Sequence, residues 1–276
     1  MRNAPNQADV RIVAKRRIVS ARQPEYHCVK TTRRLIFIEA KMSKIAILAS
    51  LSALALSTPV LAADVTGASL DFSHYNFADA DARDSGRSTL GGQMVIGFTP
   101  QFSVQGDAGI RHFRDGDWND ASWGLHAIYN AYDMATVGVF AGYEEVDGRE
   151  VDSIGLEYGT SYNGADIQAA WTNYDGHDGL IDGNIYNVSA SMPLNSELSV
   201  GGRADFLDLN GGRNSRRIGA TGTYSLAGGY DLNGELGLID DNGDDAEPYI
   251  GLGVSTKFGN GATFNRRGLA EFLPGL

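Results

Sequence analysis

The strict alternation of apolar and polar side chains between residues 121 and 146 is the feature that most constrains the fold. Mostly small or polar residues separate the apolar positions, which are Trp123, Leu125, Ala127 and Tyr129 in the first half and Ala135, Val137, Val139, Ala141 and Tyr143 in the second. A period of two is typical of β-strands with one apolar and one polar face. The segment therefore predicts a β-hairpin with a break at residues 131–133.

The aromatic residues of this hairpin lie at its two ends. Trp123 and Tyr143 are at one end of the apolar face, and Tyr129 is at the other. A hairpin in water has no need for aromatic rings at both ends of its apolar face. A transmembrane hairpin does, because amphipathic rings prefer the two membrane interfaces. The pattern therefore indicates a strand pair that crosses a bilayer.

The same alternation recurs along the chain and predicts twelve strands. Besides the two strands of the hairpin, they are 65–77, 88–98, 102–114, 151–162, 165–174, 184–192, 197–209, 216–226, 230–239 and 249–258. Five short turns alternate with six longer polar loops. An even number of strands, most of about ten residues, is typical of a closed transmembrane barrel. We therefore predict an all-β, up-and-down antiparallel transmembrane β-barrel over residues 64–258.

Two aromatic girdles follow from the same register. At the short-turn end the apolar face carries Phe98, Phe102, Tyr129, Tyr162, Tyr224, Tyr230 and Phe258. At the long-loop end it carries Phe72, Trp123, Tyr143, Trp171, Tyr186 and Phe206. The alternative, a soluble β-sandwich, would turn its apolar face inward and would need no girdles.

The front of the chain differs from the rest in charge. Residues 1–62 hold 11 of the 23 Lys and Arg residues, and the remainder has a formal net charge of −19. So acidic a body argues against nucleic-acid binding. The single cysteine, Cys28, lies in the front segment, so the body has no disulfide and no thiolate metal site.

Residues 42–63 are typical of a secretory signal peptide. Lys44 supplies the positive start, an apolar run follows, and Val60, Leu61 and Ala62 form a small-residue cleavage pattern. Residues 1–41 precede a complete signal, so we interpret them as an upstream extension from a start codon placed too early. The alternative is an extended positive region of the signal itself.

Signal peptide, alternating strands, acidic loops and a final strand GLGVSTKF ending at Phe258 together resemble the Gram-negative outer-membrane porins. The resemblance implies an outer-membrane protein that lets small hydrophilic solutes or ions diffuse passively. Its implied partners are outer-membrane lipid, lipopolysaccharide and the barrel-assembly machinery. The resemblance does not decide whether the protein forms a homo-oligomer. General porins have sixteen strands and a long constriction loop. The longest loops here, such as 78–86, have only nine residues. The resemblance therefore predicts neither a constriction loop nor the family's trimer for this chain.

Residues 259–276 extend beyond the closing aromatic residue and include Arg266, Arg267 and a short apolar stretch, Leu269–Leu273. The strand order places this C-terminal tail at the periplasmic end. We expect a loosely ordered end there; the alternative is a tail that tucks into the barrel mouth.

The polar face of the strands predicts the residues that line the lumen. The charged ones are Asp71, Asp107, Arg111, Glu144, Glu157, Asp166, Arg203, Asp205, Arg217, Asp231, Glu235 and Lys257. Carboxylates outnumber basic groups among them, which predicts a preference for cations. We predict no cofactor, no catalytic residue and no metal site. A weaker hypothesis is divalent-cation bridging to lipopolysaccharide through Asp240, Asp241, Asp244 and Asp245.

Two other functions stay open. In a closed structural barrel, paired Arg and Asp or Glu side chains would block the lumen. In a lipid hydrolase, a Ser–His pair would lie on the lipid-facing rim, where His74 and His112 have the right parity and Ser88 can lie near His74. No recognisable motif and no third orienting group supports the hydrolase.

Overall fold

The computed structural model describes residues 63–79, 85–114, 118–131, 135–177, 182–243 and 245–274. Residues 1–41 and the predicted signal peptide, except Ala63, lie outside this part of the chain. No helix in the described residues is long and apolar enough to cross a membrane.

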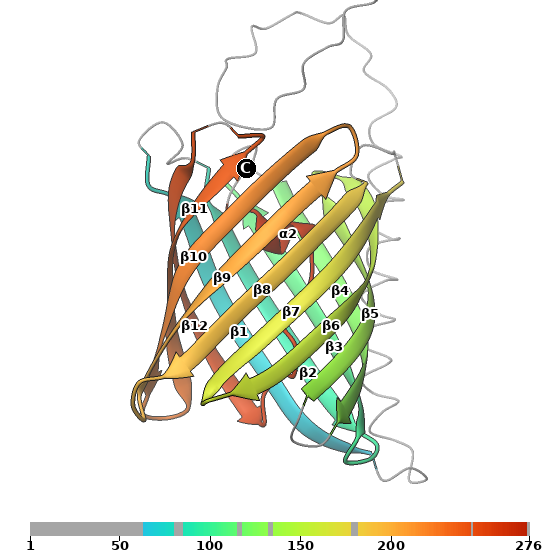
Figure 1. The fold of residues 1–276 in the computed structure, drawn as a ribbon, viewed down its shortest axis with the longest axis vertical. Helices are drawn as coiled ribbons and strands as arrows, with labels where there is room; N and C mark the ends of the chain where they lie inside the picture. Colours follow the sequence, from blue (N-terminus) through green and yellow to red (C-terminus); the bar gives the residue numbers. More distant parts are fainter. Residues whose placement is uncertain are drawn as a thin grey trace, which may run out of the picture. The chain divides into compact units, whose positions relative to one another are not determined.

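Twelve strands form one closed barrel, as the sequence predicts (Figure 1). Each strand pairs antiparallel with the next, and β1 pairs antiparallel with β12. Closure leaves no free sheet edge. The strands are β1 (Asp64–Phe77), β2 (Arg87–Gly97), β3 (Phe102–Phe113), β4 (Trp118–Ala131), β5 (Ala135–Val146), β6 (Arg149–Tyr162), β7 (Ala165–Gly176), β8 (Gly183–Pro193), β9 (Leu198–Leu209), β10 (Arg213–Leu226), β11 (Tyr230–Asp241) and β12 (Glu247–Gly259).

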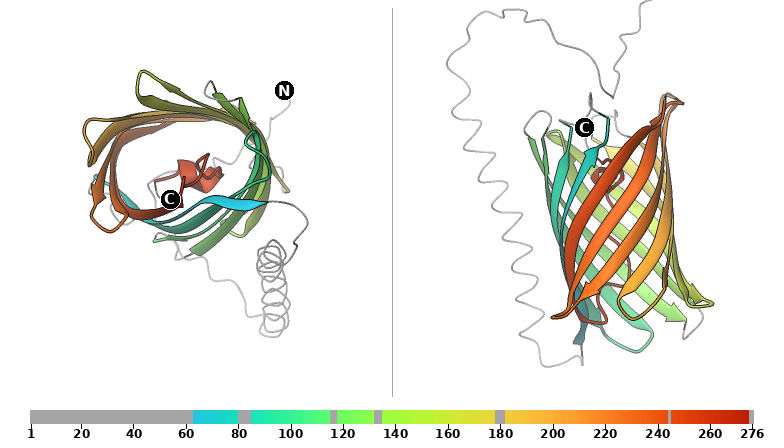
Figure 2. Two further views of the ribbon diagram at one scale, coloured as in Figure 1. Left: turned by 90° about the horizontal axis from the view of Figure 1, so that it is seen from below. Right: turned by 90° about the vertical axis from the view of Figure 1, so that its left-hand side faces the viewer.

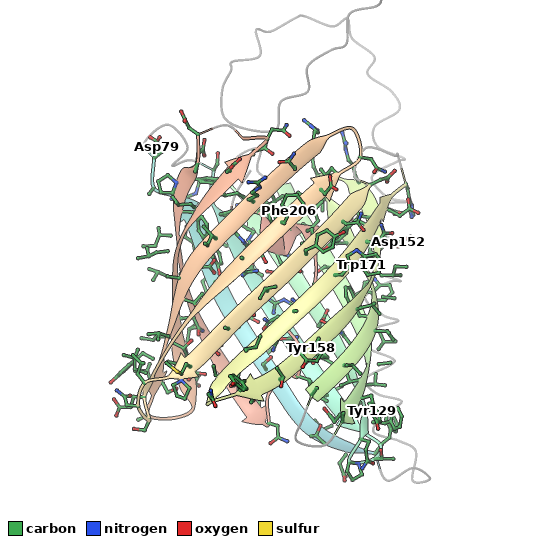
Figure 3. All side chains as sticks on the ribbon, in the orientation of Figure 1. Asp79, Tyr129, Asp152, Tyr158, Trp171 and Phe206 are labelled. Carbon is green, nitrogen blue, oxygen red and sulfur yellow. The ribbon has the colours of Figure 1, made fainter. Side chains whose placement is uncertain are left out.

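The apolar face of the barrel points outward. Leu252, Ile110 and Ile154 are each about three-fifths exposed, at 64%, 59% and 58%. In a water-soluble protein such side chains would be buried, but here the surrounding solvent is lipid. Figure 3 shows outward side chains along the whole wall, with Trp171 and Phe206 toward one end and Tyr129 near the other.

Several strands extend further at the long-loop end than predicted. β6 begins at Arg149 and β10 at Arg213, so the predicted loops 147–150 and 210–215 are too long. The turn between β5 and β6 consists of Asp147 and Gly148, which both have a positive φ, of 51° and 74°. Two successive positive φ values match the twist of the flanking strands and allow a two-residue hairpin turn.

The prediction of a loosely ordered C-terminal tail is wrong. After β12 the chain reverses at Gly259 and Gly261, whose φ angles of 59° and 72° favour glycine. Residues 260–274, which we call the plug, then enter the lumen from the short-turn end and finish with the helix α2 (Leu269–Phe272). Figure 2 shows α2 inside the ring of strands.

Candidate functional site in the barrel lumen

The lumen contains most of the predicted lining residues, and many of them are buried. Those less than a tenth exposed are Asp107, Arg111, Glu144, Glu157, Asp205, Arg217 and Glu235. In an empty channel they would face water. They are buried because the plug and the neighbouring side chains of the wall fill the space around them.

The short-turn end of the lumen is more open. Lys257 is paired with Asp231 at 3.3 Å, yet its side chain is 61% exposed. Asp166 is also exposed, and its carboxylate accepts a hydrogen bond from Ser161 Oγ at 2.5 Å. Solvent therefore reaches the wall at this end.

Three glutamines hold the backbone of the plug where it enters the middle of the barrel. Gln105 Oε1 accepts from the amides of Thr263 and Phe264 at 2.9 and 3.1 Å, and its Nε2 donates to the Phe264 carbonyl at 2.9 Å. Gln93 donates to the same carbonyl at 2.7 Å, and Gln168 donates to the Thr263 carbonyl at 3.2 Å. These bonds satisfy backbone groups that would otherwise be buried without partners.

A histidine between two carboxylates forms the next contact. His126 Nδ1 lies 2.6 Å from Glu157 Oε2, and Nε2 lies 2.7 Å from Asp107 Oδ2. A neutral imidazole has only one N–H, so two such bonds to ionised carboxylates require the imidazolium form. Arg267 Nε of the plug donates to the other oxygen of Glu157 at 2.7 Å. The plug is thereby tied to a charged chain that crosses β3, β4 and β6.

Glu271 lies in a group of guanidinium ions. It is 2.8 Å from Arg111 Nη2, 3.2 Å from Arg266 Nε and 3.9 Å from Arg87 Nη2. Burial opposes ionisation of Glu271, but the positive charges of Arg111, Arg266 and Arg87 outweigh burial and hold its pKa well below the usual range. Arg266 also binds both oxygens of Asp71 on β1.

Both ends of α2 are bonded to the wall. Glu144 accepts hydrogen bonds from the amides of Leu269 and Ala270 at the start of the helix. At its end, Arg217 donates to the Glu271 carbonyl at 2.9 Å, and Arg87 donates to the carbonyls of Ala270 and Leu273. Helix ends leave backbone groups unpaired, and these three wall side chains pair them.

An apolar cluster packs α2 against the wall near the long-loop end. Leu269 and Phe272 lie against Val151, Tyr174, Ile185, Leu207 and Leu209. Sequence reasoning missed these inward apolar side chains. Two adjacent apolar residues in a strand indicate that both of its faces are apolar at that point. Such a pair occurs in β9, where Phe206 points outward and Leu207 points inward.

Two charged residues of the wall were not predicted. Arg87 and Asp120 point into the lumen, where both are almost fully buried. They stand at strand starts that the predicted ranges 88–98 and 121–130 omit. Asp120 pairs with Arg111 at 3.2 Å, so the structure links it to the same network as the plug.

The other side of the lumen has its own charge network, which includes little of the plug. Asp205 pairs with Arg203 at 3.0 Å and with Arg217 at 2.7 Å. Arg203 lies 3.8 Å from Glu235, which accepts hydrogen bonds from the hydroxyls of Tyr249 and Tyr75. Most predicted carboxylates are therefore matched by a positive or donor group.

The residues of the two predicted girdles lie on the outer face. Trp123 stacks on Tyr143 with ring centres 6.3 Å apart, and Phe102 lies 5.0 Å from Tyr129. Most of the remaining members are exposed large side chains, among them Phe98, Tyr162, Tyr186, Tyr224, Tyr230 and Phe258. Phe206 and Trp171 are partly buried; Phe206 is covered by Arg216, and Trp171 donates to Asn184 at 3.0 Å.

The Ser–His pair considered for hydrolysis is present on the outer face. His74 Nδ1 lies 2.9 Å from Ser88 Oγ. His112 stands opposite Ser88 in the register, but its Nδ1 lies 3.2 Å from Asn119. In the described part of the chain, no side chain hydrogen-bonds the other ring nitrogen of His74, so the pair lacks the orienting group that activates a serine nucleophile.

The acidic turn between β11 and β12 uses its carboxylates in local hydrogen bonds. Asp240 accepts from the Gly243 amide at 2.9 Å, and Asp241 accepts from Ser215 Oγ at 2.5 Å. Asp244 lies outside the described residues. Bridging of divalent cations by this turn stays a prediction.

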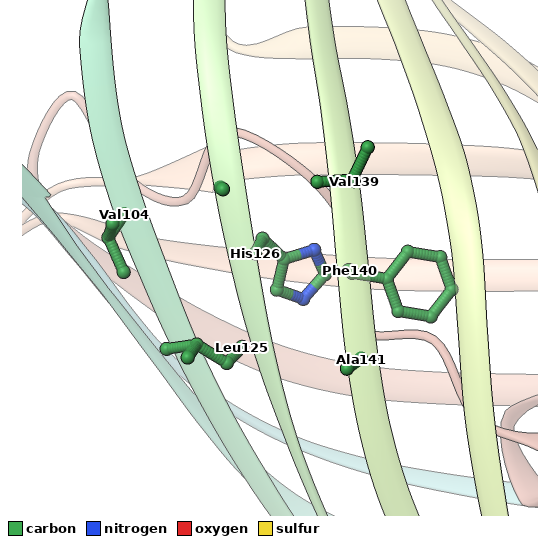
Figure 4. Close-up of a pocket in the computed structure, with 7 residues that line it drawn as sticks. Val104, Leu125, His126, Val139, Phe140 and Ala141 are labelled. Atoms are coloured by element: carbon green, nitrogen blue, oxygen red, sulfur yellow. The ribbon is translucent and has the colours of Figure 1, made fainter.

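A shallow depression of about 270 Å³ lies between β3, β4 and β5 (Figure 4). Outward apolar side chains surround it, including Val104, Leu125 and Val139, while His126 and Phe140 lie beneath. Its rim lies on the lipid-facing surface, so it offers no polar site for a solute.

Comparison with known proteins agrees with this architecture. The family model for Gram-negative porins matches residues 51–245. No curated protein matches the sequence. Among solved structures, a KdgM porin in complex with disordered oligogalacturonate is 10% identical, with a TM-score of 0.54 over 69% of this chain and 99% of its own. The NanC porin is 11% identical, with a TM-score of 0.53 over 68% of this chain and all of its own.

The family match covers more than half of the chain, and the two structural neighbours share the closed-barrel fold of this chain. The outward apolar band suits the same membrane location, and the polar lumen suits a channel. The chain belongs to the Gram-negative porin family and is an outer-membrane channel protein.

Proposed function

We propose that this porin is a passive diffusion channel for small hydrophilic solutes that prefers cations. The observation that carries the proposal is the composition of the lumen wall. The predicted lining residues include eight carboxylates and four basic side chains. Arg87 and Asp120, which the structure adds, contribute one charge of each sign, so the excess of carboxylates is unchanged.

The entrance at the long-loop end supports the same preference. Asp152, Asp175 and Asp208 are exposed on the outer face of this rim. Negative charge near a channel mouth raises the local concentration of cations. The plug opposes this effect only slightly, because its Arg266 and Arg267 are partly balanced by Glu271.

The lumen wall also bears on the class of solute. The complex of the KdgM porin contains oligogalacturonate, a polyanion. The carboxylate excess in the present lumen would repel a polyanion, so we expect small cations and neutral solutes to pass more readily than acidic oligosaccharides.

A closed structural barrel is the second candidate. The plug in the lumen favours it, because the helix α2 and the apolar cluster around Phe272 occupy space that a solute would need. The ion pair between Arg111 of the wall and Glu271 of the plug favours it for the same reason. Conductance decides between the two candidates.

We do not propose an enzymatic activity. The geometry of His74 and Ser88 is compatible with an ordinary hydrogen bond at a membrane interface. A Ser88→Ala variant should therefore have the conductance of the unmodified protein, and neither should hydrolyse phospholipid esters.

The test is single-channel conductance of residues 64–276 in a planar bilayer under a salt gradient. Stable current steps with a reversal potential that favours cations are expected. Steps that favour anions would contradict the preference but keep the channel. A folded, heat-modifiable barrel that never conducts would favour the closed structural barrel.

A further inference from the structure

We propose that the lumen wall is a binding surface for one extended peptide segment, and that the plug is its partner and can be displaced from it. The plug is not a continuation of the sheet. It contacts the wall through side chains of β1, β2, β3, β5, β6, β7 and β10, as a bound peptide would. This inference deepens the proposed channel function: the effect of the plug on conductance rests on that function.

The contacts of the plug differ in kind along its length. Near Thr263 and Phe264 the wall bonds to backbone atoms through the three glutamines. From Arg266 to Glu271 the contacts are ion pairs. Backbone bonds fix the register of the segment, and the ion pairs select its charge sequence, which is two cations followed by an anion.

The shape of the wall matches this partner. Gly138 lies under the ring of Phe264, where a Cβ would stand 2.8 Å from Cε2. Gly91 lies against the guanidinium of Arg266, which leaves no room there for a side chain. Phe264 is itself only 1% exposed. The two glycines therefore form seats for a large ring and for a long basic side chain.

The bonds that hold the plug are of a reversible kind. No described residue attaches it covalently other than its continuation from β12. The wall opposite Arg266 and Arg267 is acidic, and the wall opposite Glu271 is basic. Reversing a charge on the plug turns attraction into repulsion at that site, without touching the hydrogen bonds that close the barrel.

The plug enters at the short-turn end, where it joins β12 through Gly259 and Gly261. Withdrawal toward that end needs rotation only about this glycine hinge and no opening of the sheet. Displacement would free the lumen space that α2 occupies. We therefore infer that the seated plug sets the low-conductance state of the channel.

The experiment uses the mature chain, residues 64–276, with Ala270→Cys as its single thiol. Ala270 is fully buried in the seated plug, so a bilayer-impermeant thiol reagent should react slowly with a thiol at this position. In a Glu271→Arg background the new cation faces Arg87, Arg111 and Arg266, and labelling should be about a hundredfold faster, as expected when a buried ion pair loses one partner. Glu271→Gln should give an intermediate rate.

Asp231→Asn is the matched control, because Asp231 pairs with Lys257 and, within the described residues, forms no hydrogen bond or ion pair with the plug. It should leave labelling unchanged. Heat-modifiability on gels verifies that each variant is a folded barrel. Slow labelling of a folded Glu271→Arg barrel would overturn the proposal, as would fast labelling of the Ala270→Cys protein without that substitution.

Single-channel conductance of the same variants separates the two proposals. Faster labelling together with larger current steps supports both. Faster labelling of a barrel that still passes no current supports the displaceable plug and contradicts the channel function, because the two readouts are independent.

Discussion

Arg266 binds both carboxylate oxygens of Asp71, a residue 195 positions earlier in the chain. The pair joins the last segment of the protein to the first strand. A bidentate pair of this type combines charge with fixed geometry. This ion pair holds the plug against β1 on one side of the lumen.

Removing the charge of Asp71 should loosen the plug. In Asp71→Asn, Arg266 keeps its contact with Glu271 at 3.2 Å but loses its bidentate partner. Asp71 is partly exposed, so the loss should be about 1.5 kcal/mol, or roughly tenfold faster labelling of the Ala270→Cys thiol. Asp71→Glu should retain most of the slow rate. A rate in Asp71→Asn as slow as in the protein with Asp71 would show that the pair contributes nothing.

The seat of Phe264 predicts a graded steric effect. A Cβ at Gly138 would lie 2.8 Å from the Phe264 ring, whereas one at Gly159 would lie 3.4 Å from it. Gly138→Ala should therefore speed labelling of the thiol at position 270 more than Gly159→Ala. Gly106→Ala is the control, because nothing lies within 4 Å of its Cβ position. An effect of Gly106→Ala as large as that of Gly138→Ala would contradict the steric explanation.

Because the pKa of Glu271 is lowered in the seated plug, protonation of this residue should weaken the seating of the plug only at low pH. The pKa of the Glu271 carboxyl is lower in the seated plug than its free value of about 4.3. At a pH above that free value the ionised carboxylate stabilises the seated plug in full. This stabilisation is lost as the pH falls through the lower pKa of the seated state. A spin label on Asn265→Cys, an exposed plug residue, should be immobile at pH 7 and become mobile in strong acid. In Glu271→Gln the label should already be more mobile at pH 7. Equal mobility of the label at pH 7 in the Glu271→Gln protein and in the protein with Glu271 would contradict the assignment.

His177 at the rim should titrate above its ordinary value. Its hydrogen bond with Asp152, at 2.9 Å, and the nearby charges of Glu150 and Asp175 raise its pKa above 6.5. The interaction is present below that raised pKa and is lost as the pH rises through it. NMR of labelled imidazole should show a lower pKa in Asp152→Asn. Asp208→Asn, on another part of the rim, should leave it unchanged.

The cation preference should depend on the open end of the lumen. Asp166 is exposed there and Asp231 is partly buried beside Lys257, so the double variant Asp166→Asn/Asp231→Asn should shift the reversal potential toward zero in a salt gradient. Asp152→Asn removes a carboxylate from the outer face and should have a smaller effect. The same reversal potential in all three proteins would place the selectivity elsewhere.

The alternation of side chains predicted the barrel well. The outward positions of β4 and β5 were assigned from Trp123 to Tyr143, and the structure places these side chains on the lipid side. The reason is physical: the period of a strand is two, and a one-residue slip would put charged groups in lipid. The strand count and pairing order followed from the same constraint.

The ends of the strands and the plug could not be obtained in this way. Arg87 and Asp120 lie at strand starts where loop residues also carry charge, so the local pattern does not mark them as inward. The plug has no alternation. Its position depends on Gln93, Gln105 and Gln168 coming together, and these residues are distant from residues 260–274 in sequence and meet only in the closed barrel.

The placement of the plug also sets an order of folding. Its binding surface consists of side chains from the first strands as well as the middle ones, so the complete surface exists only after β1 has paired with β12. Contacts between such distant parts of a chain form late, because the intervening loop must close first. Burial of residue 270 therefore follows barrel closure, and its kinetics would time the seating of the plug, the last step of assembly.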